Sequence, residues 1–277
     1  DLRLIIGLLV GGALALAGAV MQGVFSNPLA DPGIMGVSAG ASLGAVIAIA
    51  LGFTSLGMFY MPAFAFVGAF VSVGITILLT LRNNKLDTTT LLLAGVAVSM
   101  LLGAFTSGIL TMINEYRLRE FLFWMVGGLD FRRWDHVLLA VGPIMTGSVI
   151  LMMLGRHLNV LVLGDTEARA LGVPVMVYRM LFLFLSSVIT ATAVCVSGSI
   201  GFVGLVVPHI VRLLVGPDHR ILLPMAAIGG ALFLVFCDTL GRVVAQPVEI
   251  RVGIMTALLG APYFLYLLHR LRSKGGA

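Results

Sequence analysis

Residues of the types that do chemistry are few in this chain, and their spacing favours structural roles. The five histidines include no pair with the spacing of metal ligands. His209 follows Pro208 in an apolar run, where helix packing or a hydrogen-bonded ring is favoured and ligation is the alternative. Cys195 and Cys237 also lie in apolar runs, where cysteine usually acts as a small buried hydrophobe. The sequence therefore predicts no metal site.

Nucleotide chemistry and ion coupling are also disfavoured. The chain has no G-x-x-x-x-G-K-[ST] loop, and neither of its lysines, Lys85 and Lys274, follows a glycine, so no phosphate cradle is expected. Asp, Glu, Lys and Arg are missing from the middle of the apolar runs, where ion-coupled carriers keep their relay residues. We expect a chain that is not an enzyme and binds no cofactor of its own.

The composition places these residues in a lipid environment. Of the 277 residues, 60% are hydrophobic and 10% are charged, whereas a soluble domain carries about 25% charged residues. The mean hydropathy is +1.11, which excludes a water-soluble fold. The net charge of +5 comes without a basic run or interleaved aromatic residues, so membrane lipid is the expected partner and nucleic acid is not.

The uncharged runs predict an all-α, polytopic transmembrane bundle that forms one domain over residues 1–277. A helix needs about 20 apolar residues to cross the hydrocarbon core. Two of the runs are long enough for two spans each, and residues 121–128 are too short to cross and predict a re-entrant or interfacial helix. The runs, which give nine spans, are Leu4–Ser26, Pro32–Thr80 (two), Thr88–Asn114, Val137–Gly155, Met180–Val211 (two, the second short), Ile221–Cys237 and Val252–Leu268.

Arginine and lysine predict the orientation, because cytoplasmic loops carry the excess of both. A cytoplasmic C-terminus puts ten of them inside and seven outside. Nine spans then leave Asp1 outside, which leads us to expect that a first span is missing from this chain. The inside set is Arg82, Lys85, Arg156, Arg169, Arg179, Arg212, Arg220, Arg270, Arg272 and Lys274, and the outside set is Arg3, Arg117, Arg119, Arg132, Arg133, Arg242 and Arg251.

Two segments suggest how the spans pack and connect. Glycines every fourth residue over 36–44 predict close helix packing, with pathway lining by Ser38 and Ser42 as the alternative. The polar loop 156–179 predicts a short capped helix: Asp165 or Thr166 can cap its start, and Gly172 can end it. Taken alone, such a helix is more often a connector than a docking element.

Several stretches together resemble the FecCD-type permeases of binding-protein-dependent ABC importers, which carry iron-siderophores, haem and cobalamin. The similarity covers nearly the whole chain in the family's order. The matching stretches are Gln22–Gly33, Gly36–Gly40, Leu91–Ala97, Phe123–Gly128, Gly201–Arg212, Asp218–Arg220 and Leu259–Pro262.

The resemblance implies a ten-helix permease in the bacterial inner membrane. Its implied partners are a second copy of the chain, two ATP-binding-cassette subunits that hold ATP and Mg, and a periplasmic or lipid-anchored substrate-binding protein. It also implies roles for individual residues. These are a cytoplasmic gate at Thr88 and Thr89, for which helix capping by Thr88 is the alternative; coupling to the ATPase through Gly164, Glu167, Ala168, Arg169 and Gly172; docking of the binding protein at Arg3 and Arg242; and pathway lining by Ser38, Ser42, Ser99 and Thr106.

The sequence thus favours an importer permease for an iron chelate (siderophore or haem) or cobalamin, driven by ATP hydrolysis on partner subunits. Two alternatives remain at this point. An ion-coupled secondary transporter would need an intramembrane ionisable residue and an internal repeat. A non-transporting membrane scaffold would use the 156–179 loop as a mere connection.

Overall fold

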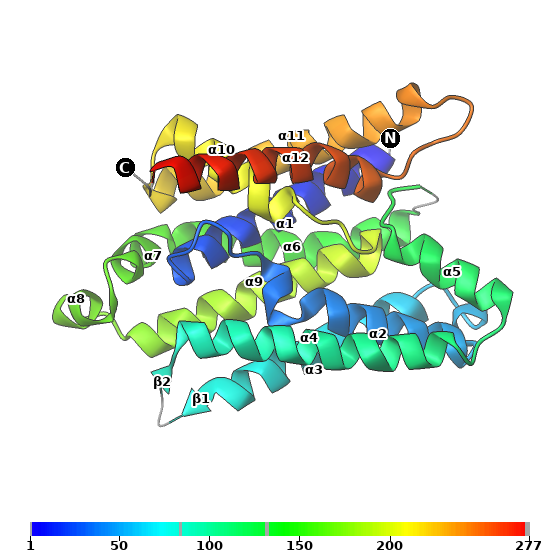
Figure 1. Ribbon diagram of the computed structural model, residues 1–277, viewed down its shortest axis with the longest axis horizontal. Helices are drawn as coiled ribbons and strands as arrows, with labels where there is room; N and C mark the ends of the chain where they lie inside the picture. Colours follow the sequence, from blue (N-terminus) through cyan, green and yellow to red (C-terminus); the bar gives the residue numbers. More distant parts are fainter. Residues whose placement is uncertain (1, 83–84, 131–132, 275–277) are drawn as a thin grey trace.

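The computed structural model describes residues 2–82, 85–130 and 133–274 as a bundle of helices (Figure 1). Two very short strands pair in an antiparallel hairpin between α3 and α4. The helices are α1 (Leu2–Val24), α2 (Val37–Ala50), α3 (Tyr60–Thr80), α4 (Thr88–Leu110), α5 (Glu115–Met125), α6 (Trp134–Met153), α7 (Gly155–Val162), α8 (Asp165–Ala170), α9 (Val175–Ser197), α10 (Val203–Val215), α11 (His219–Val244) and α12 (Val252–Lys274), with 3₁₀ turns η1 (Pro32–Met35) and η2 (Phe53–Ser55), and the strands are β1 (Leu81–Arg82) and β2 (Lys85–Leu86).

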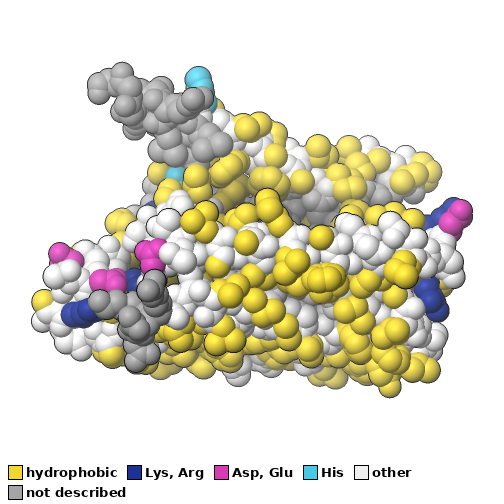
Figure 2. Space-filling model, turned by 60° about the horizontal axis from the view of Figure 1, so that its bottom comes forward, with side chains coloured by type: hydrophobic (Ala, Val, Ile, Leu, Met, Phe, Trp, Pro, Cys, Tyr) yellow, Lys and Arg dark blue, Asp and Glu magenta, His cyan; other side chains and the backbone are white. Residues whose placement is uncertain are grey.

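The bundle has two polar ends separated by an apolar middle. We call one the α8 end, where α7, α8, the β1–β2 hairpin and the end of α12 lie, and the other the α5 end, where the chain begins (Figure 1). In Figure 2 charged side chains gather at both ends, and the face between them is hydrophobic or uncharged. This distribution is that of a membrane-spanning protein.

The all-α polytopic bundle is confirmed, with apolar helices at the nine predicted places. Among the described residues, six helices are long and apolar enough to cross a membrane: α1, α3, α4, α6, α9 and α11. Helices α2 and α10 have 14 and 13 residues, which is about 20 Å and less than the hydrocarbon thickness. Each therefore needs the loop before it to complete the crossing.

Helices α1 and α9 form the centre of the bundle. In their most apolar windows 72% and 78% of the residues are buried, against 22% in α4. Helix α4 therefore offers most of its surface to lipid or to another chain. The short helix predicted near 121–128 is α5, which begins earlier, at Glu115, and lies at the α5 end with Phe121 and Trp124 turned inward.

The packing predicted from the spaced glycines is present between α2 and α3. A Cβ atom at Gly40 would overlap the carbonyl oxygen of Gly68, and one at Gly44 would overlap that of Phe64. Backbone contact of this kind is how helices associate in lipid, where burial of apolar surface supplies no driving force between them.

Candidate functional site: the coupling segment and the two polar ends

The predicted loop 156–179 consists mainly of two short helices, α7 and α8, followed by the first turn of α9. Gly164 and Gly172 bracket α8 with φ of 118° and 78°, values that favour glycine because it lacks a Cβ. At the end of α8 the N–H of Val173 donates to Ala168 O and that of Gly172 donates to Arg169 O. These two bonds are a Schellman cap, so Gly172 ends the helix as predicted.

The predicted cap at the start of α8 is wrong. Gly164 is the N-cap residue, and it has no side chain to offer. The Asp165 carboxylate is turned instead to Arg179, whose Nη2 lies 2.6 Å from Asp165 Oδ1. In this position the carboxylate pairs with an opposite charge, whereas at the cap it would accept only from a neutral backbone N–H, which explains why Asp165 faces the bundle.

Helix α8 is an exposed element. Ala168 is its one buried residue, while Glu167 and Arg169 are exposed at its surface. Arg169 lies 3.9 Å from Asp165 in an exposed pair within the helix, and such pairs add little stability. The residues expected to couple to an ATPase are thus brought together on one projecting helix.

Arg179, on the first turns of α9, ties α8 to the segment before α4. Its side chain is 9% exposed, and besides Asp165 its Nη1 donates to the backbone oxygen of Leu86 at 3.3 Å. Sequence reasoning counted Arg179 only as an inside charge. Nothing local reveals this role, because Leu86 is 93 positions away in the chain.

The gate candidates Thr88 and Thr89 begin α4, and Asp87 separates them from Leu86. Capping by Thr88 is wrong: Asp87 is the N-cap and accepts hydrogen bonds from the backbone N–H and the hydroxyl of Thr90, both below 2.8 Å. Those two bonds, helped by the positive charge of Arg179, hold the pKa of Asp87 below its ordinary value. Thr88 and Thr89 are left free of the capping role.

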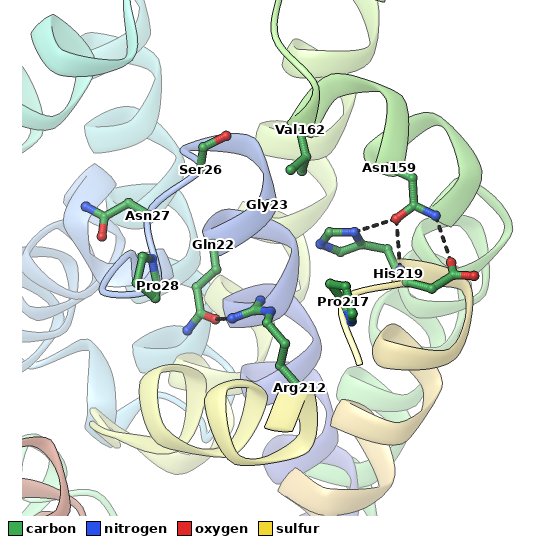
Figure 3. Close-up of a pocket in the computed structure, with 11 residues that line it drawn as sticks. Gln22, Gly23, Ser26, Asn27, Pro28, Asn159, Val162, Arg212, Pro217 and His219 are labelled. Carbon is green, nitrogen blue, oxygen red and sulfur yellow. Dashed lines mark hydrogen bonds between the residues drawn. The ribbon is translucent and has the colours of Figure 1, made fainter. Parts of the chain in front are cut away.

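A cavity of about 540 Å³ opens at the α8 end between α1, α7 and the turn from α10 to α11 (Figure 3). Asn159 on α7 bridges it to that turn: its Nδ2 donates to Asp218 Oδ1 at 2.7 Å, and its Oδ1 lies 2.7 Å from His219 Nδ1. On the opposite wall Arg212 donates to Gln22 Oε1 at 2.8 Å. This network fixes α7 to α11 and joins α10 to α1.

The carboxylate of Asp218 is strongly stabilised in its charged form. It caps α11 by accepting from the N–H of Arg220, and it also accepts from Asn159. These hydrogen bonds, with the first the larger cause, lower the pKa of Asp218 to about 2. Asp218 is therefore ionised throughout the physiological range and pairs with Arg220 at 3.0 Å.

At the α5 end the two docking candidates meet at one carboxylate. Arg3 donates to both oxygens of Asp238 at 2.8–3.0 Å and to Glu249 at 2.8 Å. Arg242 lies 3.4 Å from Asp238, four residues before it on α11, so the two form an ion pair within the helix. The exposed fraction of the side chain is 39% for Arg242 and 20% for Arg3, and a cavity of about 410 Å³ adjoins Arg242.

The pathway-lining candidates lie on two neighbouring helices, α2 and α4. Ser38, Ser42 and Ser99 are half-buried, and the Thr106 hydroxyl is buried and donates to Leu102 O. Ser99 faces Gly36 at the start of α2, where a Cβ would lie 3.4 Å from its Oγ. In the described part of the chain, no three His, Cys, Asp or Glu side chains gather as a metal site requires.

The described residues form nine apolar helices, a projecting two-helix segment at one end and an arginine cluster at the other, and together these features define a polytopic membrane permease. Residues 2–270 match the FecCD transport family. The chain belongs to this family, and it is the permease subunit of an ABC importer rather than an enzyme.

Three relatives illustrate the match. The chain is 48% identical over 267 residues to the cobalamin import system permease protein BtuC of Halobacterium salinarum, covering 96% of this chain and 71% of that protein. It is 45% identical to the hemin transport system permease protein HmuU of Yersinia pestis, covering 98% and 82%. A solved inward-facing ABC transporter of the metal-chelate type is 36% identical, with a TM-score of 0.91 over 97% of this chain and 85% of that chain.

Proposed function

We propose that the chain carries a bulky metal chelate, an iron-siderophore, haem or cobalamin, across the bacterial inner membrane. The observation that carries this proposal is an identity of 45–48% over almost the whole chain to permeases named for hemin and for cobalamin. In the described residues no Asp, Glu, Lys or Arg lies near the middle of a membrane-crossing helix, where ion-coupled carriers keep their relay residues. We therefore assign the energy to ATP and Mg on partner subunits, and in this proposal the chain binds no cofactor.

The partners in this proposal are a second copy of the chain, two ATP-binding-cassette subunits and a substrate-binding protein. The α8 end faces the cytoplasm, together with the C-terminus, and α8 presents Glu167 and Arg169 to the ATPase. Their exposure, and the glycines that shape the helix, support this placement. Binding of ATP then favours one of two arrangements of the permease, which is a population shift driven by a ligand.

The opposite end receives the substrate-binding protein, and Arg242 is the main contact. Arg242 is more exposed than Arg3, and the Arg3 guanidinium is already bonded to Asp238 and Glu249. Both facts support Arg242 as the main docking residue. Thr88 and Thr89 narrow the cytoplasmic gate, and their freedom from capping supports this role. A chelate that must be released after crossing requires walls that are small and only weakly polar. Such walls are formed by Ser38, Ser42, Ser99 and Thr106.

The test is reconstitution of the chain in proteoliposomes with its ATP-binding-cassette subunit and binding protein. We expect the ATPase subunit to co-purify with the chain and uptake of one chelate from a panel of siderophores, haem and cobalamin to require ATP. Uptake that follows an ion gradient without ATP would favour a secondary transporter. Co-purification without uptake of any chelate would favour a scaffold.

A further inference from the structure

Movement of α8 must reach the start of α4 if an ATPase at α8 is to work a gate at Thr88 and Thr89. Among the described residues, the side chain of Arg179 bonds both to α8 and to Leu86, at the end of β2 and two residues before α4. We propose that Arg179 is the positioning residue that transmits movement of the coupling helix to the gate. This inference rests on the proposed function and adds a physical connection to it.

The contacts of Arg179 form a three-way junction. The guanidinium makes two bonds to Asp165 of α8, at 2.6 and 3.3 Å, and one to Leu86 O at the end of β2, while its backbone belongs to α9. A planar guanidinium can hold a carboxylate and a carbonyl in fixed directions at once, which the single ammonium of a lysine does less well. Displacement of α8 is therefore transmitted through Arg179 to Leu86, two residues before the gate candidate Thr88.

Helix α8 has few other attachments through which to act. It has six residues, of which Ala168 alone is buried, and its other ion pair, between Asp165 and Arg169, stays within the helix. In Figure 1 it lies at the extreme edge of the bundle. Packing alone therefore transmits little force from α8, and the bond to Arg179 is its strongest side-chain contact with the spans.

The surroundings of Arg179 leave room for a second arrangement. A cavity of about 190 Å³ adjoins the junction and is lined by both Asp165 and Asp87. The Nε atom of Arg179 is buried and makes no hydrogen bond to any described residue, which is costly for a charged group. Asp87 thus gives the guanidinium a carboxylate to turn to when α8 moves, and Asp87 caps the gate helix itself.

The test compares Arg179→Gln with the wild type in the reconstituted importer. Glutamine keeps a polar side chain but cannot join a carboxylate and a carbonyl as the guanidinium does. We expect the ATPase subunit to co-purify and to hydrolyse ATP as before, while ATP-driven uptake falls at least tenfold. The Arg179→Lys variant should recover only part of the uptake. Arg220→Gln is the matched control, because Arg220 lies at the same end and, within the described part of the chain, its side chain pairs with Asp218 alone, two residues away.

A second measurement tests the connection between α8 and α4 without relying on transport. Spin labels at the exposed positions Thr166 on α8 and Leu93 on α4 report the distance between the coupling helix and the gate helix. We expect a narrow distance distribution that ATP shifts in the wild type and that is broad and unresponsive in Arg179→Gln. Should Arg179→Gln fail to assemble, Asp165→Asn weakens the same junction from its exposed side and should also reduce uptake.

The outcomes separate the two proposals. A wild type that binds no ATPase subunit and imports no chelate overturns the proposed function. A wild type that imports, beside an Arg179→Gln variant with unchanged uptake and an unchanged distance response, leaves the function standing and overturns the role of Arg179.

Discussion

The two ends of the molecule each centre on a mostly buried arginine, but the two arginines join different kinds of partner. At the α5 end Arg3 links long helices, because Asp238 belongs to the 26-residue α11 and is itself 4% exposed. At the α8 end Arg179 links a six-residue exposed helix to a hairpin strand. The α5-end cluster therefore strengthens a packed core, whereas the α8-end junction connects parts with few other restraints.

This difference indicates that the two ends have different functions. A rigid end suits recognition, because the partner then meets the same surface each time it binds, and Arg242 is exposed on that surface. A loosely attached helix suits the transmission of movement, because elements that move are drawn from the least stable parts of a structure. The following predictions test this comparison from the largest expected effect to the smallest.

Replacing Arg3 should give the largest loss of stability. Arg3→Ala leaves the buried Asp238 with the weaker partner Arg242 alone, and breaking a buried pair in this way costs about 3–5 kcal/mol. The free energy of unfolding is measured by SDS titration in mixed micelles. Arg179→Ala serves as the comparison and should cost much less, because Asp165 is 45% exposed and water replaces its lost partner. Equal losses at both ends would contradict the comparison.

Reversing Arg242 should weaken binding without unfolding the protein. Arg242→Glu places a negative charge where we propose that acidic residues of the binding protein dock, and like charges across an interface lower affinity strongly. We expect a dissociation constant at least tenfold larger in a pull-down or surface-binding assay. Arg242→Gln, which removes the charge without reversing it, should lie between the two. Unchanged affinity in Arg242→Glu would remove Arg242 from the docking surface.

Two asparagines, one at each end, sharpen the comparison on a smaller scale. Asn159 bonds across the fold to Asp218 and His219, whereas Asn114 only caps its own helix by accepting from the N–H of Arg117. Asn159→Ala should cost about 1–3 kcal/mol and speed hydrogen exchange in both α7 and the start of α11. Asn114→Ala should cost about 1 kcal/mol and speed exchange in α5 alone. If hydrogen exchange in Asn159→Ala became faster in α7 alone, the Asn159 side chain would not stabilise the contact between α7 and α11.

Much of the fold could be predicted from the sequence because hydropathy and glycine spacing are local properties. In the described part of the chain the seven apolar runs form nine helices near the predicted bounds, and the spaced glycines of α2 do pack against α3. The capping assignments for Asp165 and Thr88 failed for different reasons. Asp165 turns to Arg179, 14 positions away, and leaves the N-cap position to Gly164. Asp87 caps α4 in place of Thr88 by accepting from Thr90, three residues further on, which is a local contact that sequence reasoning overlooked.

The candidate site was harder to predict where its bonds span long distances in the chain. Asp238 and Arg242 are four residues apart, a spacing that brings two side chains together on one helix face. The bonds from Arg3 to Asp238, from Asn159 to Asp218 and from Arg179 to Leu86 cross 235, 59 and 93 positions. A single sequence gives no signal for such pairs, so the junctions that join the elements appear only in the structure.

The smallest predicted effect is a pH dependence at the α8 end. The pKa of Asp218 is lowered from 3.8 to about 2 by its hydrogen bonds in the folded state. A carboxylate with a lowered folded pKa adds stability above its unfolded pKa and loses it as the pH falls through the folded value. The wild type should therefore lose a small contribution between about pH 4 and pH 2, and Asp218→Asn should not, when the thermal midpoint in detergent is followed from pH 7 downward. Because Asp218 is exposed to water, the difference should be small, and parallel midpoint curves for the two proteins over that window would show that the folded protein does not favour the charged carboxylate.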